Sequence, residues 1–403
     1  MKRLITISLS LFISSCTSLN IDPYLDLLSP NHLSKDIDNV DVSLVWSKDI
    51  GEERDYKTGV LQPIFKDGIS YTIDSQGYVS AINLSSGKPV WVYDLDMNVS
   101  SGLGMHDNKI FFGTNDGMYY GFNIDKLATP YSFLDNLDFI NLLDDTKVEP
   151  DVSIQLRSEA SSPAVGIDNL IFIKLDDGDT ASINLDQSLL EWNYKGRNVP
   201  LSMKGSAAIA TLNNNIFVPR DDGNIISLVA NTGKLNWLVS ISARSGRNEL
   251  ESLRDVEITP IIDNGVLYIG SFQGNLVSID IFTGSIIWSK PMSVISHLSV
   301  DSSYLYASDN SGSIYALDKY DGSVVWKQSM PEQIITTQTH VIAEYLVTLS
   351  TQGHIIILNK EDGRLLTKKD ILSDIDPQSK GLMIDKLLYI VSKDGRLNAI
   401  KIN

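Results

Sequence analysis

Residues Thr259–Lys290 read TPIIDNGVLYIGSFQGNLVSIDIFTGSIIWSK, in which short apolar runs alternate with turn dipeptides. The runs are rich in β-branched and aromatic residues, as strands are. They are separated by Asn264-Gly265, Gln273-Gly274 and Thr283-Gly284. Glycine supplies the positive φ that such tight turns need. The stretch therefore predicts four short antiparallel strands joined by hairpins.

The same pattern recurs along the chain with a fixed spacing from glycine to tryptophan. Five Trp each follow a Gly by fourteen positions: Gly77 with Trp91, Gly178 with Trp192, Gly223 with Trp237, Gly274 with Trp288, and Gly312 with Trp326. Adding Gly117, Gly353 and Gly395 gives eight glycines that begin a third strand. Repeats of roughly 40 residues with four strands each are typical of β-propellers. We predict an all-β fold, an eight-bladed propeller of four-stranded antiparallel blades.

The eighth blade is split between the two ends of the chain. Its third strand is Arg396–Ile400, whereas Leu44–Ser47 is a fourth strand with no third strand before it. We expect Val42–Ile50 to complete the blade begun near Gly381, because this pairing removes exposed sheet edges. Trp46 then takes the same position as the other five Trp.

The Trp side chains are predicted to fill the gap between neighbouring blades, since an aromatic side chain buries about 150–250 Å². At the same offset from the glycine, Tyr131 follows Gly117 and Thr367 follows Gly353. We expect those two blades to be docked less well.

The longest interval between these glycines indicates an insertion near Asp125–Ala160. Apolar residues among acids between Phe133 and Leu143 favour a short amphipathic helix or an extended loop there. We interpret the insertion as a surface excursion, and the alternative is a contact for a partner.

The first residues have the pattern of an exported lipoprotein. A basic start is followed by the apolar stretch Leu4–Ile13, which is too short to span a bilayer. Ile13-Ser14-Ser15-Cys16 ends in the single cysteine of the protein. This resembles a bacterial lipobox, in which cleavage precedes the cysteine and its thiol is lipidated. The alternative is an ordinary signal peptide with an incidental Cys.

These signals divide the chain into three parts. We predict a signal peptide at residues 1–15, a lipidated N-terminus and tether at 16–40, and one propeller domain at 41–403. Several acyl chains on Cys16 would make a stable membrane anchor. Thr17 in place of Asp implies the inner leaflet of the outer membrane.

Charge and motifs exclude several classes of function. The net charge of -17 argues against binding nucleic acid or an anionic membrane surface by electrostatics. None of the five His pairs with another at a metal-ligand spacing, so we predict no metal site. No phosphate-binding glycine loop or Gly-x-Ser-x-Gly elbow is present. Most acids lie in turns such as Asp221-Asp222-Gly223, where we expect them to serve turn geometry.

The repeat resembles that of quinoprotein propellers, as in Ser278-Ile279-Asp280, Thr283-Gly284 and Trp288. Many quinoprotein dehydrogenases carry an adjacent Cys pair over the cofactor and a much longer chain. This chain has one cysteine, assigned to the lipobox. We therefore predict no enzymatic activity and no cofactor. The alternatives are a quinoprotein-like periplasmic dehydrogenase and a propeller with a small-ligand pocket at its axis.

Lipobox, tether and quinoprotein-like blades together resemble the BamB family, lipoproteins of the outer-membrane β-barrel assembly machinery. Val199–Ala207 is similar to the family's Leu-Ser-Leu-Arg-Gly-Glu-Ser-Ala segment, which contacts the barrel protein BamA. The resemblance implies that Leu201, Met203 and Lys204 make this contact. Glu249–Pro260 is similar to the acidic Ser-Asp-Val-Asp-Thr-Thr-Pro segment. It places Asp255 and Glu257 beside the first loop.

The two segments depart from the family pattern at three positions. Met203 replaces Leu, Glu257 replaces Asp, and Lys204 replaces Arg, which loses the planar bidentate fork. An alternative interpretation is that Leu201 and Met203, which alternate, form the inward face of a strand.

The resemblance implies a monomeric scaffold anchored at the periplasmic face of the outer membrane. Such a scaffold would bind the periplasmic (POTRA) domains of BamA and assist assembly and insertion of outer-membrane β-barrels. It would act by orienting those domains or by offering a strand edge to unfolded clients. We prefer the first because a propeller has few free edges.

Overall fold

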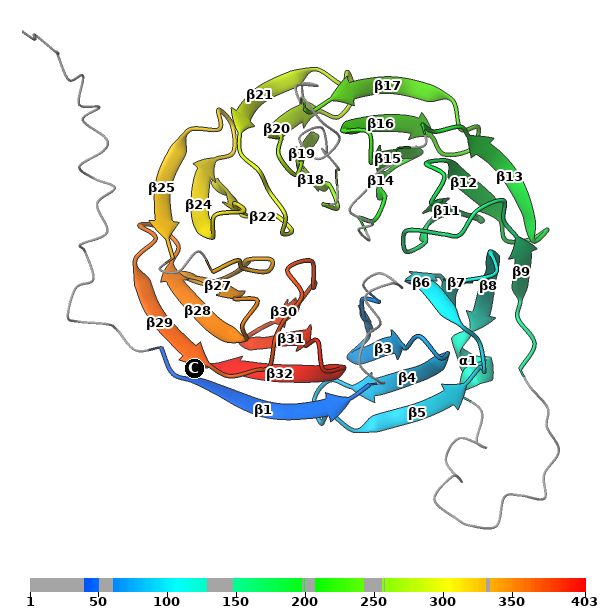
Figure 1. The fold of residues 1–403 in the computed structure, drawn as a ribbon, viewed down its shortest axis with the longest axis horizontal. Helices are drawn as coiled ribbons and strands as arrows, with labels where there is room; N and C mark the ends of the chain where they lie inside the picture. Colours follow the sequence, from blue (N-terminus) through cyan, green and yellow to red (C-terminus); the bar gives the residue numbers. More distant parts are fainter. Residues whose placement is uncertain are drawn as a thin grey trace, which may run out of the picture. The chain divides into compact units, whose positions relative to one another are not determined.

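The computed structural model describes residues 40–50, 61–128, 148–197, 199, 207–242, 256, 258–330 and 334–403. The chain divides into two units, Met1–Lys35 and Asp36–Asn403, and every described residue belongs to the second. That unit contains eight four-stranded antiparallel sheets arranged as blades around a ring (Figure 1). The predicted eight-bladed propeller is confirmed.

The blades follow one another in chain order, and each has its first strand nearest the axis of the ring (Figure 1). The strands of blades one to four are β2 (Ile64–Lys66), β3 (Ile69–Ile73), β4 (Tyr78–Asn83) and β5 (Pro89–Asp94); β6 (Val99–His106), β7 (Lys109–Thr114), β8 (Met118–Asn123) and β9 (Val152–Gln155); β10 (Val165–Ile167), β11 (Leu170–Lys174), β12 (Thr180–Asn184) and β13 (Leu189–Tyr194); β14 (Ala210–Leu212), β15 (Asn215–Pro219), β16 (Asn224–Val229) and β17 (Leu235–Ser240).

The strands of blades five to eight are β18 (Ile261–Asp263), β19 (Val266–Gly270), β20 (Asn275–Asp280) and β21 (Ile286–Pro291); β22 (Ser299–Val300), β23 (Tyr304–Ser308), β24 (Ser313–Asp318) and β25 (Val324–Ser329); β26 (His340–Ile342), β27 (Tyr345–Leu349), β28 (His354–Asn359) and β29 (Leu365–Asp370); β30 (Leu382–Ile384), β31 (Leu387–Val391), β32 (Arg396–Ile402) and β1 (Val42–Asp49).

Blade eight closes the ring with strands from both ends of the chain. β1 pairs antiparallel with β32, from Val42 opposite Ile402 to Asp49 opposite Arg396. Side chains reinforce the pairing, since Arg396 Nε donates to Ser47 Oγ at 2.8 Å. The predicted completion of the last blade by Val42–Ile50 is confirmed.

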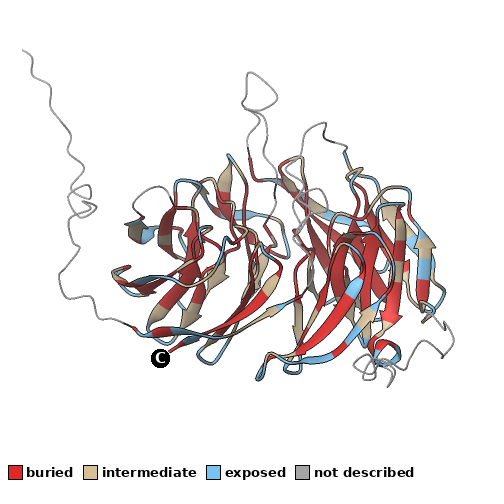
Figure 2. Ribbon diagram, turned by 60° about the horizontal axis from the view of Figure 1, so that its bottom comes forward, coloured by how far each residue is buried: buried red, intermediate tan, exposed pale blue. Residues whose placement is uncertain are grey.

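The core lies between neighbouring blades and runs around the whole ring. Middle strands are covered on both faces, so they consist of consecutive apolar residues, as in the fully buried Ile171, Phe172 and Ile173 of β11. Figure 2 shows buried residues concentrated within the blades, while outer strands alternate between exposed and buried positions. The sequence pattern of short continuous apolar runs follows from this two-sided packing.

Each Trp joint links one blade to the next by the same pair of contacts. Trp288 in β21 donates its indole N–H to the Lys319 carbonyl of blade six at 3.0 Å. Gly322, in the turn that follows Lys319, lies against the Trp288 ring, where an added Cβ would approach ring carbon Cδ2 to 2.7 Å. Gly322 has a φ of +73°.

The same joint recurs at four other blade junctions. Indole N–H groups donate across each junction from Trp46 to Leu84, from Trp192 to Ala230, from Trp237 to Ile281, and from Trp326 to Lys360. The glycines against those rings are Gly87, Gly233, Gly284 and Gly363. The predicted packing role of Trp, including that of Trp46, is confirmed at these junctions. Trp91 is also buried, but the next blade has helix α1 (Ile124–Leu127) in place of the glycine turn.

Thr367 occupies the Trp position in the blade that precedes ring closure. It lies opposite Ile357 in the register that Trp326 holds opposite Ala316. The neighbouring blade has no turn between its outer strands here, because β32 and β1 come from different ends of the chain. Thr367 is buried, and its hydroxyl donates to the Val40 carbonyl at 3.0 Å. This junction is therefore docked by a different contact, which suits a small side chain.

The prediction that Tyr131 takes the Trp position of blade two is wrong. Val152 of β9 lies opposite Gly121, the register position that Trp91 holds opposite Ala81 in blade one. Counting fourteen residues from Gly117 fails because the insertion lies between β8 and β9 and shifts the offset. The insertion is also shorter than Asp125–Ala160, since α1 begins at Ile124 and β9 spans Val152–Gln155. Tyr131 itself and residues 133–143 lie outside the described residues.

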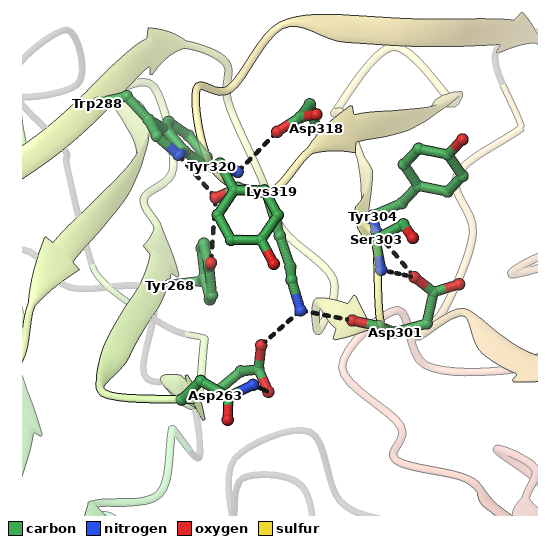
Figure 3. Close-up of polar contacts among 10 residues, drawn as sticks. Asp263, Tyr268, Trp288, Asp301, Ser303, Tyr304, Asp318, Lys319 and Tyr320 are labelled. Atoms are coloured by element: carbon green, nitrogen blue, oxygen red, sulfur yellow. Dashed lines mark hydrogen bonds and ion pairs between the residues drawn. The ribbon is translucent and has the colours of Figure 1, made fainter.

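A buried lysine strengthens the joint between blades five and six (Figure 3). The carbonyl of Lys319 accepts from both Trp288 and the Tyr268 hydroxyl, the latter at 3.1 Å. Its Nζ donates to Asp263 Oδ2 at 2.8 Å and to the Asp301 carbonyl at 3.0 Å. Only 4% of the Lys319 side chain is exposed, so the ion pair satisfies a charge that would otherwise be buried alone.

Changing Gly322 to Ala should destabilise the protein more than changing Gly68 to Ala. Both glycines have a positive φ, +73° and +76°, so both substitutions lose about 1–2 kcal/mol to backbone strain. Only Gly322 lies against an indole ring, whereas an added Cβ at Gly68 meets nothing within 4 Å. Overpacking should cost Gly322→Ala about 1–3 kcal/mol more. Urea unfolding of residues 20–403 measures the difference, and equal losses would contradict the Trp joint.

Removing the imidazole of His340 should flatten the loss of stability in acid. Burial lowers the pKa of His340 to about 4, against an ordinary value of 6.5. The unfolded chain therefore binds a proton first as the pH falls, and stability present above pH 6.5 is lost down to about pH 4. Between pH 7 and pH 4 the free energy of unfolding of His340→Gln should fall by about 2–3 kcal/mol less than that of the wild type. Urea unfolding at several pH values tests this, and parallel curves would overturn it.

Candidate partner-binding face

The antiparallel blades give the propeller two different faces. Turns between second and third strands, and the links from each blade to the next, leave the ring on one face, which we call the link face. Turns between first and second strands and between third and fourth strands lie on the opposite face. Phe282 and Tyr320 are highly exposed there, at 73% and 71%.

The predicted partner-binding residues all belong to two links on the link face. Leu201, Met203 and Lys204 lie in the link between β13 and β14, and Asp255 and Glu257 lie in the link between β17 and β18. All five residues, and the predicted lipidation site Cys16, lie outside the described residues. Their sequence-based assignments stay predictions.

Buried anchors fix the described ends of both links. Ala207 and Ile209 are buried at the end of the first link, and Val256 and Ile258, which flank Glu257, are buried in the second. Blades four and five are adjacent in the ring (Figure 1). The two predicted contact segments therefore end side by side on neighbouring blades.

The Thr259 hydroxyl ties these two ends together. Its Oγ1 accepts the backbone N–H of Ala208 at 3.0 Å and the ammonium of Lys380 at 2.7 Å. Ala208 precedes blade four, Thr259 precedes blade five, and Lys380 precedes blade eight. Figure 1 shows β30 and β18 on opposite sides of the ring, so the Lys380 side chain bridges the axis. One oxygen thus couples both links to a distant blade.

Further polar contacts cross the axis beside Lys380. The Gln378 carbonyl accepts from Gln62 Nε2 of blade one and contacts His297 Nε2 of the link before blade six, both at 3.2 Å. The Lys380 N–H donates to Gln62 Oε1 at 3.1 Å. Burial lowers the pKa of Lys380 to about 8. Burial, together with the positive charge of Lys380, lowers the pKa of His297 well below its ordinary value.

This network bears on the two alternatives that need a ligand at the axis. A quinone cofactor or a small ligand there would compete for space with the hydrogen-bonded Lys380 and Gln62 side chains. The residues at the axis therefore do not fit a quinone. Within the described ranges no group of three or more His, Cys, Asp or Glu is placed to hold a metal ion.

Charged residues surround the start of the first link, where blade three meets blade four. Asp179 accepts the Gly196 N–H at 2.7 Å and Asn193 Nδ2 at 2.6 Å, which fixes the chain as it leaves β13. Lys174 lies 3.4 Å from Asp221, and Arg220 lies 3.4 Å from Asp222.

The acids of this region do more than the sequence predicted. Asp222 does serve turn geometry, since it accepts the Asn224 N–H at 3.3 Å. Asp221 pairs with a buried cation, and Asp179 holds the segment that leads into the first link. Spacing in the sequence gives no signal for these contacts, because they join residues of different blades or strands.

The fold and the closed axis define a quinoprotein-type β-propeller whose link face offers protein surface with two paired loops. A family model described as "Outer membrane protein assembly factor BamB" matches residues 35–149, 149–328 and 312–403. The chain belongs to the BamB family. The match covers the whole propeller and confirms the resemblance drawn from the lipobox, the repeat and the two links.

Curated relatives agree over nearly the full chain. Outer membrane protein assembly factor BamB of Yersinia pestis is 25% identical over 387 residues, which cover 96% of this chain and 95% of the relative. The Escherichia coli K12 protein of the same name is 24% identical over 401 residues, with the same coverage of both chains.

Solved structures share the fold. The crystal structure of BamB from Moraxella catarrhalis has a TM-score of 0.74 at 19% identity and covers 90% of this chain and 100% of its own. A quinohemoprotein alcohol dehydrogenase from Comamonas testosteroni has a TM-score of 0.62 at 12% identity and covers 90% and 76%. Among the described residues, no helix has the length and apolar character to cross a membrane.

Replacing Thr259 by Val should loosen the end of the first link. The change keeps the shape of the side chain but removes the oxygen that Ala208 and Lys380 share. The amide of Ala208 should exchange with solvent up to about tenfold faster, because one hydrogen bond contributes about 0.5–1.5 kcal/mol. Hydrogen–deuterium exchange of a peptide spanning residues 207–209 measures this. Thr259→Ser keeps the oxygen and should exchange as the wild type does, and equal exchange in Thr259→Val would contradict the tie.

Proposed function

We propose that this protein is a non-enzymatic lipoprotein scaffold of the outer-membrane β-barrel assembly complex. It binds the periplasmic domains of BamA through the link face and assists assembly and insertion of outer-membrane β-barrel proteins. The observation that carries the proposal is the pairing of the two family-specific links, whose ends share one hydroxyl at Thr259. The family match along the whole propeller supports it.

Membrane attachment forms part of the same proposal. Cys16 carries the lipid, residues 17–40 tether the propeller, and the chain stands at the periplasmic face of the outer membrane as one copy in the complex. Names of the relatives support this location, because they describe outer membrane assembly factors.

The contact surface combines apolar, basic and acidic side chains. Leu201 and Met203 supply apolar anchors beside the Lys204 cation, with Asp255 and Glu257 on the neighbouring link. Apolar anchors with a polar surround are the residues that carry most binding energy in protein interfaces. A link face held rigid across its axis favours orientation of the partner's domains over capture of unfolded clients.

The alternative mechanism is strand addition at the outer edges of the blades. Outer strands expose apolar side chains, such as Leu189 at 59% and Leu238 at 51%. Normal orientation of the partner's domains in a complex that lacks this protein would overturn the orienting mechanism and favour strand addition.

Changing Leu201, Met203 and Lys204 together to Ala should abolish binding to the partner. The test is a pull-down of residues 20–403 on the periplasmic domains of BamA, where we expect affinity to fall about tenfold or more. The matched control changes the exposed Phe282 and Tyr320 of the opposite face to Ala and should bind as the wild type does. Both variants must keep the wild-type melting temperature.

The outcomes separate function from site. Binding by the wild type and by both variants keeps the function but moves the contact elsewhere. Failure of the folded wild-type protein to bind would overturn the proposed function.

A further inference from the structure

A small charged pocket lies on the link face between blades three and four. It is lined by Lys174, Gly178, Thr180, Arg197, Arg220 and Asp221, together with the apolar end of β15. Gly178 and Gly196 leave no room for larger residues, since an added Cβ at Gly196 would lie 1.6 Å from the Gly178 carbonyl oxygen. The same added atom would lie 3.0 Å from Arg220 Nη2, so the guanidinium of blade four reaches the chain that leaves blade three.

Arg220 is buried with part of its guanidinium unused. The residue is 7% exposed, and its Nε lies 3.4 Å from Asp222 Oδ1. Its Nη1 is buried without a hydrogen-bond partner, and so is the Thr180 hydroxyl in the pocket wall. Leaving a buried charged donor without an acceptor is costly, and native structures rarely do so. The pocket therefore lacks an acceptor for these two groups.

Charge and size limit what the acceptor can be. Three cations and one carboxylate line the pocket, which favours an anionic group. The free space is about 10 Å³, enough for one small group and too little for a phosphate ester with its substituent. A carboxylate matches a guanidinium in shape and forms strong charge-assisted hydrogen bonds with it.

We propose that this pocket binds a carboxylate side chain of the partner protein, with Arg220 as its principal donor. Arg197, which is exposed at the mouth, lies three residues before Pro200 in the link that carries Leu201. The pocket thus extends the partner-binding face from blades four and five onto blade three. This inference rests on the proposed function, and it adds a second, polar anchor to the apolar one.

The first experiment tests the pocket without the partner. Sodium acetate is titrated into residues 20–403 at constant ionic strength against sodium chloride, and side-chain Nε–Hε resonances of arginine are followed by NMR. The resonance of Arg220 is the one that Arg220→Met removes. It should shift saturably with acetate and not with chloride. No acetate-dependent shift would overturn the assignment of a carboxylate site.

The second experiment measures affinity for the partner's periplasmic domains. Arg220→Met should weaken binding about tenfold or more, and Arg220→Lys should weaken it less, because it keeps the charge but not the fork. The matched control is Lys319→Met, which also removes a buried, ion-paired cation but on the opposite face. It should lower the melting temperature and leave the affinity unchanged.

The two readouts distinguish failure of this inference from failure of the proposed function. If acetate binds but Arg220→Met, shown to be folded, holds the partner as the wild type does, the pocket is not part of the interface and the inference fails. If the wild type does not bind the partner at all, the proposed function fails as well. A double-mutant cycle between Arg220→Met and Asn or Gln substitutions in the partner identifies the carboxylate by its coupling energy.

Discussion

The antiparallel pairing of β1 with β32 is the constraint on which the rest of the structure depends. A blade packs on both faces only if it has two neighbours, so an open ring would expose two blade faces and the core between them. Pairing from Val42–Ile402 to Asp49–Arg396 closes the ring and also delivers Trp46 to its junction with blade one. The junction at Thr367 shows the same dependence, because its hydroxyl bonds to the segment that enters β1.

Closure turns eight similar blades into a rigid platform. Indole N–H bonds and glycine turns hold neighbouring blades at the periphery, while Lys380, Gln62 and Thr259 hold distant blades together at the axis. Links that start from buried anchors on such a platform keep their relative positions. Loops on a rigid scaffold are a common solution for binding a partner.

Sequence reasoning recovered what depends on local patterns. The glycine turns, the Trp register and the split blade are each encoded within a few tens of residues, so the fold followed from the period. Val152 escaped because an insertion breaks the count from Gly117, and only pairing with Gly121 reveals its position. Lys380 and Thr259 are 121 residues apart, and their contact depends on the width of the ring. Arg220 gives no signal in the sequence, because its partners come from another blade and from the tight approach of Gly178 to Gly196.

The central claim is that the link face holds the barrel-assembly partner, and site-specific photo-crosslinking in cells tests it most directly. A photoreactive amino acid is placed at Arg197 or Gln76, exposed on the link face, and at Phe282 or Tyr320, exposed on the opposite face. The account predicts crosslinks to BamA from Arg197 and none from Phe282 or Tyr320, with Gln76 of blade one reporting how far the contact extends. Crosslinks from Phe282 or Tyr320 without any from Arg197 would contradict it.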